Sequence, residues 1–290
     1  MRRHRLAVVL SGGMLGLLAG LALLAPLLGW ALGLDAEAVD LFDRLGPPSA
    51  DHPLGTDELG RDLLMRLLEG GRVSLAVGLS AAVAGSALGT VIGLSAGFVG
   101  GRLDDLLMRL ADAVIALPLL PLLIVLAAVD LTKLGLSQQV AEAETTSLIR
   151  LVLLVALVSW PTTARLVRAQ TLSLREREFV MAARSLGYGT DRIMLRHILP
   201  NTAAPILVAM TLAVGNVVLF ESVLSFLGLG VRPPTPSWGN MLTGAQELIW
   251  QAPMQAVWPG LLIFLTVVSV NLLGDALRDI LDPRTRQRRQ

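Results

Sequence analysis

Long apolar stretches separated by polar loops organise this sequence. A helix needs about 20 predominantly apolar residues to cross the hydrocarbon core of a bilayer. Apolar stretches of roughly that length occupy residues 6–34, 73–99, 106–129, 147–164, 202–226 and 257–273. One such stretch fits a buried core helix of a soluble protein, but six in one chain do not. We therefore predict an all-α polytopic membrane protein with about six transmembrane helices.

The composition supports this prediction and excludes several other classes of protein. Hydrophobic residues make up 53% of the 290 positions and charged residues only 16%, compared with about 25% charged residues in an average soluble protein. The chain has no cysteine, which excludes disulfides and thiolate metal sites. Its formal net charge of +1 gives no reason to expect nucleic acid as a partner.

Two interpretations compete for the first apolar stretch. Arg2, Arg3 and Arg5 precede it, as basic residues precede the apolar part of a signal peptide. That apolar part is usually about 7–15 residues long, whereas this stretch is far longer and further spans follow it. We therefore favour a retained membrane anchor over a cleaved signal peptide.

The distribution of arginines predicts the orientation of the spans. Basic residues are enriched in short loops on the cytoplasmic side of a membrane. Arginines gather before the first span, within residues 165–200 and at the C-terminus, whereas residues 35–72 carry more acidic than basic side chains. An even number of spans then places both termini and the basic segment in the cytoplasm.

Two of the predicted spans carry a row of small residues at every fourth position. The rows are Gly12, Gly16 and Gly20 in the first span, and Gly85, Gly89, Gly93 and Gly97 in the second. This spacing places the glycines on one helix face, where they let two helix backbones approach closely. We interpret both rows as packing surfaces. A sliding surface in a protein that changes shape is the alternative, and the sequence does not separate the two.

Few polar residues lie inside the spans, and Glu221 is the most informative of them. A helix from Pro200 to Glu221 is about 31 Å long, or about one hydrocarbon thickness. We therefore expect Glu221 near the outer interface. Ion-coupled secondary transporters usually place carboxylates near the midplane, so this position disfavours that class. Asn216 and Asn271 lie deeper, where interhelical hydrogen bonding is the favoured role and pore lining is the alternative.

Residues 171–201 predict a structured cytoplasmic segment. Ser173 and Glu176 have the spacing of a capping box, a helix is expected from Glu178 to Leu186, and Gly187 suits its C-terminal cap. The narrow apolar face of this helix consists of Phe179, Ala182, Ala183 and Leu186. A helix lying on the lipid surface is one interpretation. Because this apolar face is small, we favour a docking surface for a cytoplasmic protein.

This segment resembles the cytoplasmic coupling loop of ABC importer permeases, which follows the pattern E-A-A-x3-G-x9-I-x-L-P. Ala182, Ala183, Gly187, Leu199 and Pro200 match the pattern. Two positions depart from it, since Met181 replaces the leading Glu and His197 stands where Ile is usual.

Further motifs resemble one branch of that family, the dipeptide, oligopeptide and nickel permeases. They are HPLGTD at 52–57, LGRD at 59–62, LSFLGLGV at 224–231, PPTPSWGN at 233–240 and NLLGD at 271–275. Together they resemble the second, C-type permease subunit. Residues 130–146 match no motif of this branch.

The resemblance implies a type I ABC importer permease-like fold and a set of partners. Residues 1–72 would form an N-terminal transmembrane helix and an extracytoplasmic segment, and residues 73–290 the transporter domain, with the coupling loop at 171–201. The implied location is a bacterial or archaeal plasma (inner) membrane. The implied partners are a homologous permease, two ATP-binding cassette subunits, an extracytoplasmic substrate-binding protein and membrane lipid. The implied cargo is di- or oligopeptides, with nickel or another small solute as the alternative.

The same resemblance implies which residues couple the permease to its ATPases. They are Glu178, Phe179, Ala182, Ala183, Arg184, Ser185, Leu186, Gly187 and Tyr188. The chain contains no G-x-x-x-x-G-K-[ST] motif. We therefore expect no cofactor in this chain, and ATP and Mg²⁺ on the partner subunits.

An enzyme is the remaining alternative. Residues 93–97 fit G-x-S-x-G, the motif of serine hydrolases, but that motif requires a turn between a strand and a helix. Here it lies within a predicted membrane helix. His52 has only scattered carboxylates near it in sequence and makes a poor nickel site. We therefore predict neither catalytic residues nor metal ligands in this chain.

Overall fold

The computed structural model describes residues 2–281, which are helical apart from loops and one isolated bridge between Thr56 and Asp62. The longer helices are α1 (Arg2–Leu32), α2 (Leu63–Val99), α3 (Gly101–Ala116), α4 (Leu119–Ala127), α6 (Glu144–Leu174), α9 (Leu199–Phe226) and α11 (Met254–Leu281). Short helices join them: η1 (Leu41–Asp43), η2 (Leu131–Leu134), α5 (Gln138–Glu142), α7 (Glu178–Ser185), α8 (Thr190–Ile193), the π-helix η3 (Met194–Ile198), η4 (Asn240–Leu242) and α10 (Ala245–Leu248).

Five helical stretches are long and apolar enough to cross a membrane: Val8–Leu32, Leu63–Val99, Glu144–Leu174, Thr190–Phe226 and Met254–Leu281. A sixth span exists only if α3 and α4 count as one, and these two helices are bent by 89° relative to each other. The prediction of about six spans is confirmed. The expectation of one continuous helix over 106–129 is wrong, because Pro118 drives the preceding Leu117 into an extended conformation.

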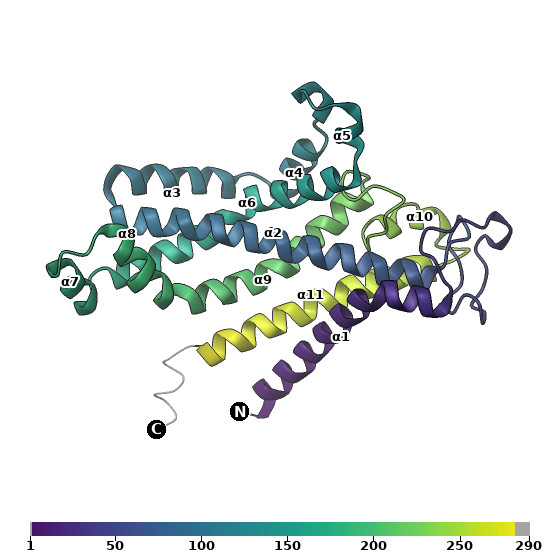
Figure 1. The fold of residues 1–290 in the computed structure, drawn as a ribbon, viewed down its shortest axis with the longest axis horizontal. Coiled ribbons are helices and arrows are strands. Elements are labelled where there is room, and N and C mark those ends of the chain that lie inside the picture. Colours follow the sequence, from purple (N-terminus) through teal and green to yellow (C-terminus); the bar gives the residue numbers. More distant parts are fainter. Residues whose placement is uncertain (1, 282–290) are drawn as a thin grey trace.

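The membrane helices form an elongated bundle with α2 at its centre (Figure 1). Helix α2 packs along α6 and also contacts α9 and α1. One apolar core between α2, α6 and α9 includes Val77, Ala81, Val155 and Val217. Helix α2 begins at Leu63, so a domain boundary after residue 72 falls inside this helix.

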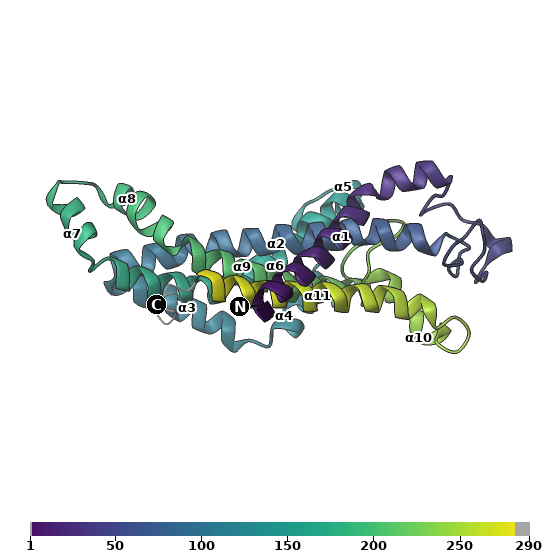
Figure 2. The ribbon, with the colours of Figure 1, turned by 90° about the horizontal axis from the view of Figure 1, so that it is seen from below.

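The two ends of the bundle carry different loops. Helices α7 and α8 lie at one end, and α10 with the segment between α1 and α2 lies at the other, in both views (Figures 1 and 2). Helix α1 starts, and α11 finishes, on the α7 side of the molecule (Figure 1). The basic segment and both described chain ends therefore lie on the same side of the bundle.

Ion pairs of arginine and aspartate lie at both ends of the bundle. Arg168 on α6 binds Asp104 on α3 through two contacts of 2.5 and 2.6 Å. At the opposite end, Asp57 contacts Arg61 at 2.7 Å and Arg66 at 3.2 Å, and these three side chains are almost completely buried. The first pair joins α3 to α6. Since removing one partner of a buried pair leaves an uncompensated charge, the Asp57 cluster holds the segment before α2 to Arg66 of that helix.

Candidate coupling and translocation sites

The predicted coupling segment begins with the end of α6. This helix continues to Leu174, and Ser173 belongs to its last turn. The predicted capping box is therefore wrong. The residue that precedes α7 is Arg177, and no side chain caps the start of this helix.

The predicted end of α7 is confirmed. Gly187 adopts φ +79°, a left-handed conformation that glycine reaches without steric cost. Its amide donates to the Arg184 carbonyl at 2.9 Å, and the Tyr188 amide donates to the Ala183 carbonyl at 3.1 Å. These bonds satisfy carbonyls that a helix end would otherwise leave unpaired.

The apolar residues of α7 divide between two faces. Val180 and Ala183 are buried and pack in a small core with Leu94 of α2, Val167 of α6 and Ile198 of η3. The expectation that Ala183 shares one apolar face with Phe179, Ala182 and Leu186 is therefore wrong. Its helical position relative to Val180 directs it toward this core.

Part of the outward surface of α7 is apolar. Phe179 is 42% exposed, Met181 49% and Leu186 73%, and Ala182 is exposed beside them. Large apolar side chains that stay accessible together are typical of a binding surface. Helix α7 therefore combines a buried face that holds it to the bundle with an accessible apolar face. We name the four exposed residues the α7 knob.

The remaining predicted coupling residues surround the α7 knob. The Arg184 guanidinium lies 5.1 Å from the centre of the Phe98 ring, which connects α7 to the end of α2. Tyr188 stacks on His197 at 6.1 Å, and Arg192 lies 4.3 Å from the Tyr188 ring centre. Glu178 and Ser185 are exposed on α7. The π-helix η3 then joins this cluster to α9.

A groove of about 920 Å³ is lined by residues of α3, α4, α6, α9 and α11. Its polar lining consists of Ser159, Thr162, Thr163, Gln170, Asn201, Asn216 and Arg278, and its other lining residues are apolar. Ligand pockets typically have volumes of about 300–1,000 Å³. Of these residues, only Asn216 was a pore-lining alternative from sequence, because the others can be assigned only when the orientation of each helix is known.

Glu221 is completely buried near the end of α9. Ser225 donates to its Oε1 at 2.7 Å, and Ser74 of α2 donates to its Oε2 at 2.9 Å. The Trp238 amide donates in turn to the Ser74 hydroxyl at 3.1 Å. Glu221 therefore joins α2, α9 and the loop after α9. Its depth relative to a bilayer remains a prediction.

The hydrolase alternative does not fit the geometry. Residues 93–97 lie within the last turns of α2, without the strand-to-helix turn that a nucleophile on such a motif requires. A Cβ atom on Gly97 would meet the Thr171 Cβ at 2.7 Å. This motif therefore belongs to the contact between α2 and α6.

Comparison with known proteins identifies the family. Residues 89–287 match the family described as binding-protein-dependent transport system inner membrane component. The nickel transport system permease protein NikC of Escherichia coli K12 is 42% identical over 267 residues, which cover 92% of this chain and 91% of that protein.

Two further relatives are named after dipeptide transport and glutathione transport. The dipeptide transport system permease protein DppC of Alkalihalophilus pseudofirmus is 42% identical and covers 83% of this chain and 75% of that protein. The glutathione transport system permease protein GsiD of Escherichia coli O6:K15:H31 is 43% identical and covers 88% of this chain and 80% of that protein. The polytopic fold, the motifs and these likenesses agree. The chain belongs to the binding-protein-dependent inner membrane components, as a non-catalytic, C-type ABC importer permease of the peptide, nickel and glutathione branch.

Proposed function

We propose that this permease imports di- or oligopeptides, together with a homologous permease that closes the open side of the groove. The observation that carries the proposal is the groove lining. Hydroxyl and amide side chains lie among apolar ones, and Arg278 is the one charged residue among those that line it. Such a surface offers hydrogen bonds to peptide groups and accepts varied side chains. Imidazole suits nickel as a ligand, and no histidine is among the described residues that line the groove, so the groove fits a nickel ion less well.

The proposed orientation places α7, the start of α1 and the end of α11 in the cytoplasm. The arginines of residues 165–200 and of both termini support it, since basic loops favour the cytoplasmic side. The acidic segment after α1 and the loop after α9 then face outward, toward a substrate-binding protein. Residues 1–72 supply the first span and most of this outer surface, and residues 73–290 supply the transporter domain with its coupling loop at 171–201.

We further propose that the α7 knob docks into one of two ATP-binding cassette subunits, which carry ATP and Mg²⁺. The apolar surface formed by Phe179, Ala182 and Leu186 supports this docking, and Val180 and Ala183 attach it to the bundle. Movement of the ATPase would therefore move α7 as a rigid unit. The π-helix η3 lies where that movement reaches α9, a position at which such irregular turns often act as hinges.

Reconstitution tests the transport proposal. The four-subunit complex in proteoliposomes, with its binding protein outside, is expected to accumulate radiolabelled dialanine when ATP is enclosed. A matched preparation with a non-hydrolysable ATP analogue is the control. ATP-driven uptake of ⁶³Ni²⁺ without dialanine uptake would replace the peptide proposal by the nickel alternative.

Neighbouring alanines test the docking proposal. Ala182→Trp adds bulk on the α7 knob, so this variant is expected to co-purify with at least tenfold less ATPase while its own melting temperature stays unchanged. Ala183→Trp adds the same bulk in the core below and is expected to lower the melting temperature. Normal ATPase recovery with Ala182→Trp would remove α7 as the docking element.

Because the chain has no cysteine, single cysteines test the orientation. Ser185→Cys and Ser49→Cys lie at opposite ends of the bundle, and both positions are exposed. A membrane-impermeant maleimide added to intact cells is expected to label only Ser49→Cys.

A further inference from the structure

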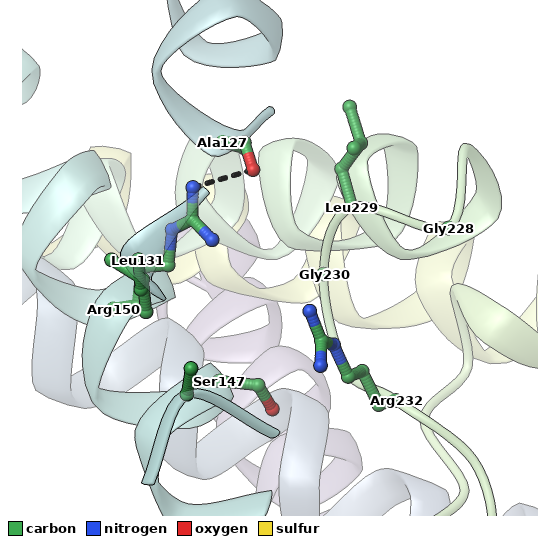
Figure 3. Close-up of a pocket in the computed structure, with 9 residues that line it drawn as sticks. Ala127, Leu131, Ser147, Arg150, Gly228, Leu229, Gly230 and Arg232 are labelled. Carbon is green, nitrogen blue, oxygen red and sulfur yellow. Dashed lines mark hydrogen bonds between the residues drawn. The ribbon is translucent and has the colours of Figure 1, made fainter. Parts of the chain in front are cut away.

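A small pocket lies at the end of the bundle where α6 begins and α9 ends. Its volume is about 50 Å³, and its lining includes Arg150 of α6, Arg232 of the loop after α9, and Ser147. Both guanidinium groups are directed toward the same space, from opposite sides (Figure 3). No acidic residue is among the described residues that line the pocket, and two like charges in one cavity repel each other, so the pocket favours an anion.

Arg150 is held firmly in this position. Its Nη2 donates to the carbonyls of Leu126 at 3.0 Å, Ala127 at 2.6 Å and Val129 at 2.7 Å, at the end of α4. All three bonds use the same nitrogen. Within residues 2–281, Nε and Nη1 of Arg150 have no hydrogen-bond partner, and these donors remain for a ligand.

The backbone on both sides of Arg232 is held in place by hydrogen bonds. The preceding Val231 is buried, and its amide donates to the Ser225 hydroxyl at 3.0 Å. The Asn240 side chain donates to the carbonyls of Val231 at 3.2 Å and Thr235 at 2.8 Å. The Arg232 side chain itself is exposed and forms no ion pair within the described part of the chain. Its guanidinium group is therefore available for an ionic contact with a ligand.

No carboxylate of the described residues pairs directly with Arg150 or Arg232. Asp130 is the carboxylate that acts on Arg150, but neither arginine has a carboxylate oxygen within 4.0 Å among the residues that the structure describes. Asp130 already accepts from the Thr132 amide at 2.9 Å and from the Thr132 hydroxyl at 2.8 Å, and these bonds lower the pKa of its carboxyl group. Asp130 thus remains ionised beside Thr132 and does not fill the pocket.

Volume and position limit the ligand. A single water needs about 10–15 Å³ of such space, so 50 Å³ accommodates one carboxylate but not a whole peptide. Val158 is the first residue of α6 that lines the groove. It lies about two helical turns after Arg150, which corresponds to about 12 Å along the helix axis. The pocket and the groove therefore lie in line along α6 and α9.

We propose that the pocket between Arg150 and Arg232 binds the carboxylate of the transported solute at the outer end of the groove. Guanidinium groups bind carboxylates through charge-assisted hydrogen bonds, and the Ser147 hydroxyl lies in the same lining. The substrate class is thereby a carboxylate-bearing solute such as a peptide, and a free metal cation is repelled. This inference rests on the import function and the orientation proposed above.

Direct binding to the assembled complex tests this inference. Saturation-transfer NMR on the complex in nanodiscs, without binding protein, uses dialanine and its C-terminal amide as probes. Dialanine is expected to bind at least fivefold more tightly than the amide. Arg232→Gln is expected to remove that preference, and Arg232→Lys to retain part of it. Arg44→Gln removes an exposed arginine elsewhere on the same side and is expected to change nothing.

Two results would overturn the inference. Equal dialanine binding by the wild-type complex and Arg232→Gln would show that the pocket does not take a solute carboxylate. Unchanged dialanine binding together with weaker docking of the binding protein in Arg232→Gln would assign the pocket to an acidic side chain of that protein. Failure of the proposed function is a separate result, since it appears as absent ATP-driven dialanine uptake by the wild-type complex.

Discussion

Helices α1 and α2 carry the same four-residue glycine spacing, and the structure uses the two rows differently. A Cβ atom on Gly89 of α2 would lie 2.5 Å from the Trp160 carbonyl oxygen and 3.0 Å from the Ala164 nitrogen of α6. A Cβ atom on Gly16 of α1, or on Gly12 and Gly20, would meet nothing within 4 Å. The packing interpretation is confirmed for the row on α2, whereas the row on α1 makes no such contact with any part of residues 2–281.

The two rows differ because α1 packs against the bundle through a face that does not include its glycine row. Within residues 8–32 of α1, the buried residues are Ser11, Leu18, Ala22, Ala25 and Gly29. Their spacing defines a face on a different side from Gly12, Gly16 and Gly20. Helix α1 contacts α11 and α2. Glycines at every fourth position therefore identify a helix face that a second helix can approach closely. They do not show whether a second helix packs there.

The largest effect is expected at the contact between α2 and α6. Gly89→Val places side-chain atoms against backbone atoms of α6, which cannot rotate away. Overpacking of a core usually costs about 1–3 kcal/mol, and we expect about 3 kcal/mol or more here. Size-exclusion profiles of the detergent-solubilised complex should show aggregated or unassembled protein. A monodisperse complex of normal stability would contradict the close contact.

A smaller effect is expected where a glycine of α2 faces a side chain. A Cβ atom on Gly78 would lie 2.6 Å from Cγ2 of Val218 on α9. We expect Gly78→Ala to destabilise the protein by about 1–2 kcal/mol. In a double-mutant cycle, Val218→Ala should recover about 1 kcal/mol of that loss, as measured by equilibrium denaturation in detergent. Strict additivity would show that the two residues do not touch.

At Gly187, glycine is required by the backbone conformation and not by close packing. Its φ is +79°, and no atom lies within 4 Å of an added Cβ. Gly187→Val is expected to cost about 1–2 kcal/mol locally and to reorient α7. Uptake should fall several-fold while ATP hydrolysis by the complex continues. Gly187→Asn, which tolerates this conformation better, is the matched control. Normal uptake by the valine variant would separate this turn from coupling.

The smallest effect is expected on α1. Gly16→Ala adds a methyl group to open space and improves helix propensity, by up to about 1 kcal/mol in a helix exposed to water. The melting temperature of the complex should therefore not decrease. A decrease similar to that of Gly78→Ala would mean that the α1 row packs against another subunit.

A structural feature could be predicted from the sequence when neighbouring residues alone determine it. The C-terminal cap at Gly187 was predictable from sequence because one residue type satisfies one local backbone requirement. The break between α3 and α4 had a local signal too, in Pro118, but its 89° bend depends on how the two helices pack. The inward position of Ala183 could not be predicted, because Ala182 and Ala183 are the same residue type and only packing decides which of them is buried.

The sequence by itself determined the helical membrane class, the approximate spans, the coupling segment and the family, because hydrophobic periodicity and short motifs are properties of neighbouring residues. Only the tertiary structure decided which glycine row packs, which side chains line the groove, and that Glu221 is buried among serines. It also brought together Arg150 and Arg232, two residues far apart in the chain. These features depend on distances between helices, which are set by the packing of the whole bundle and not by any one segment.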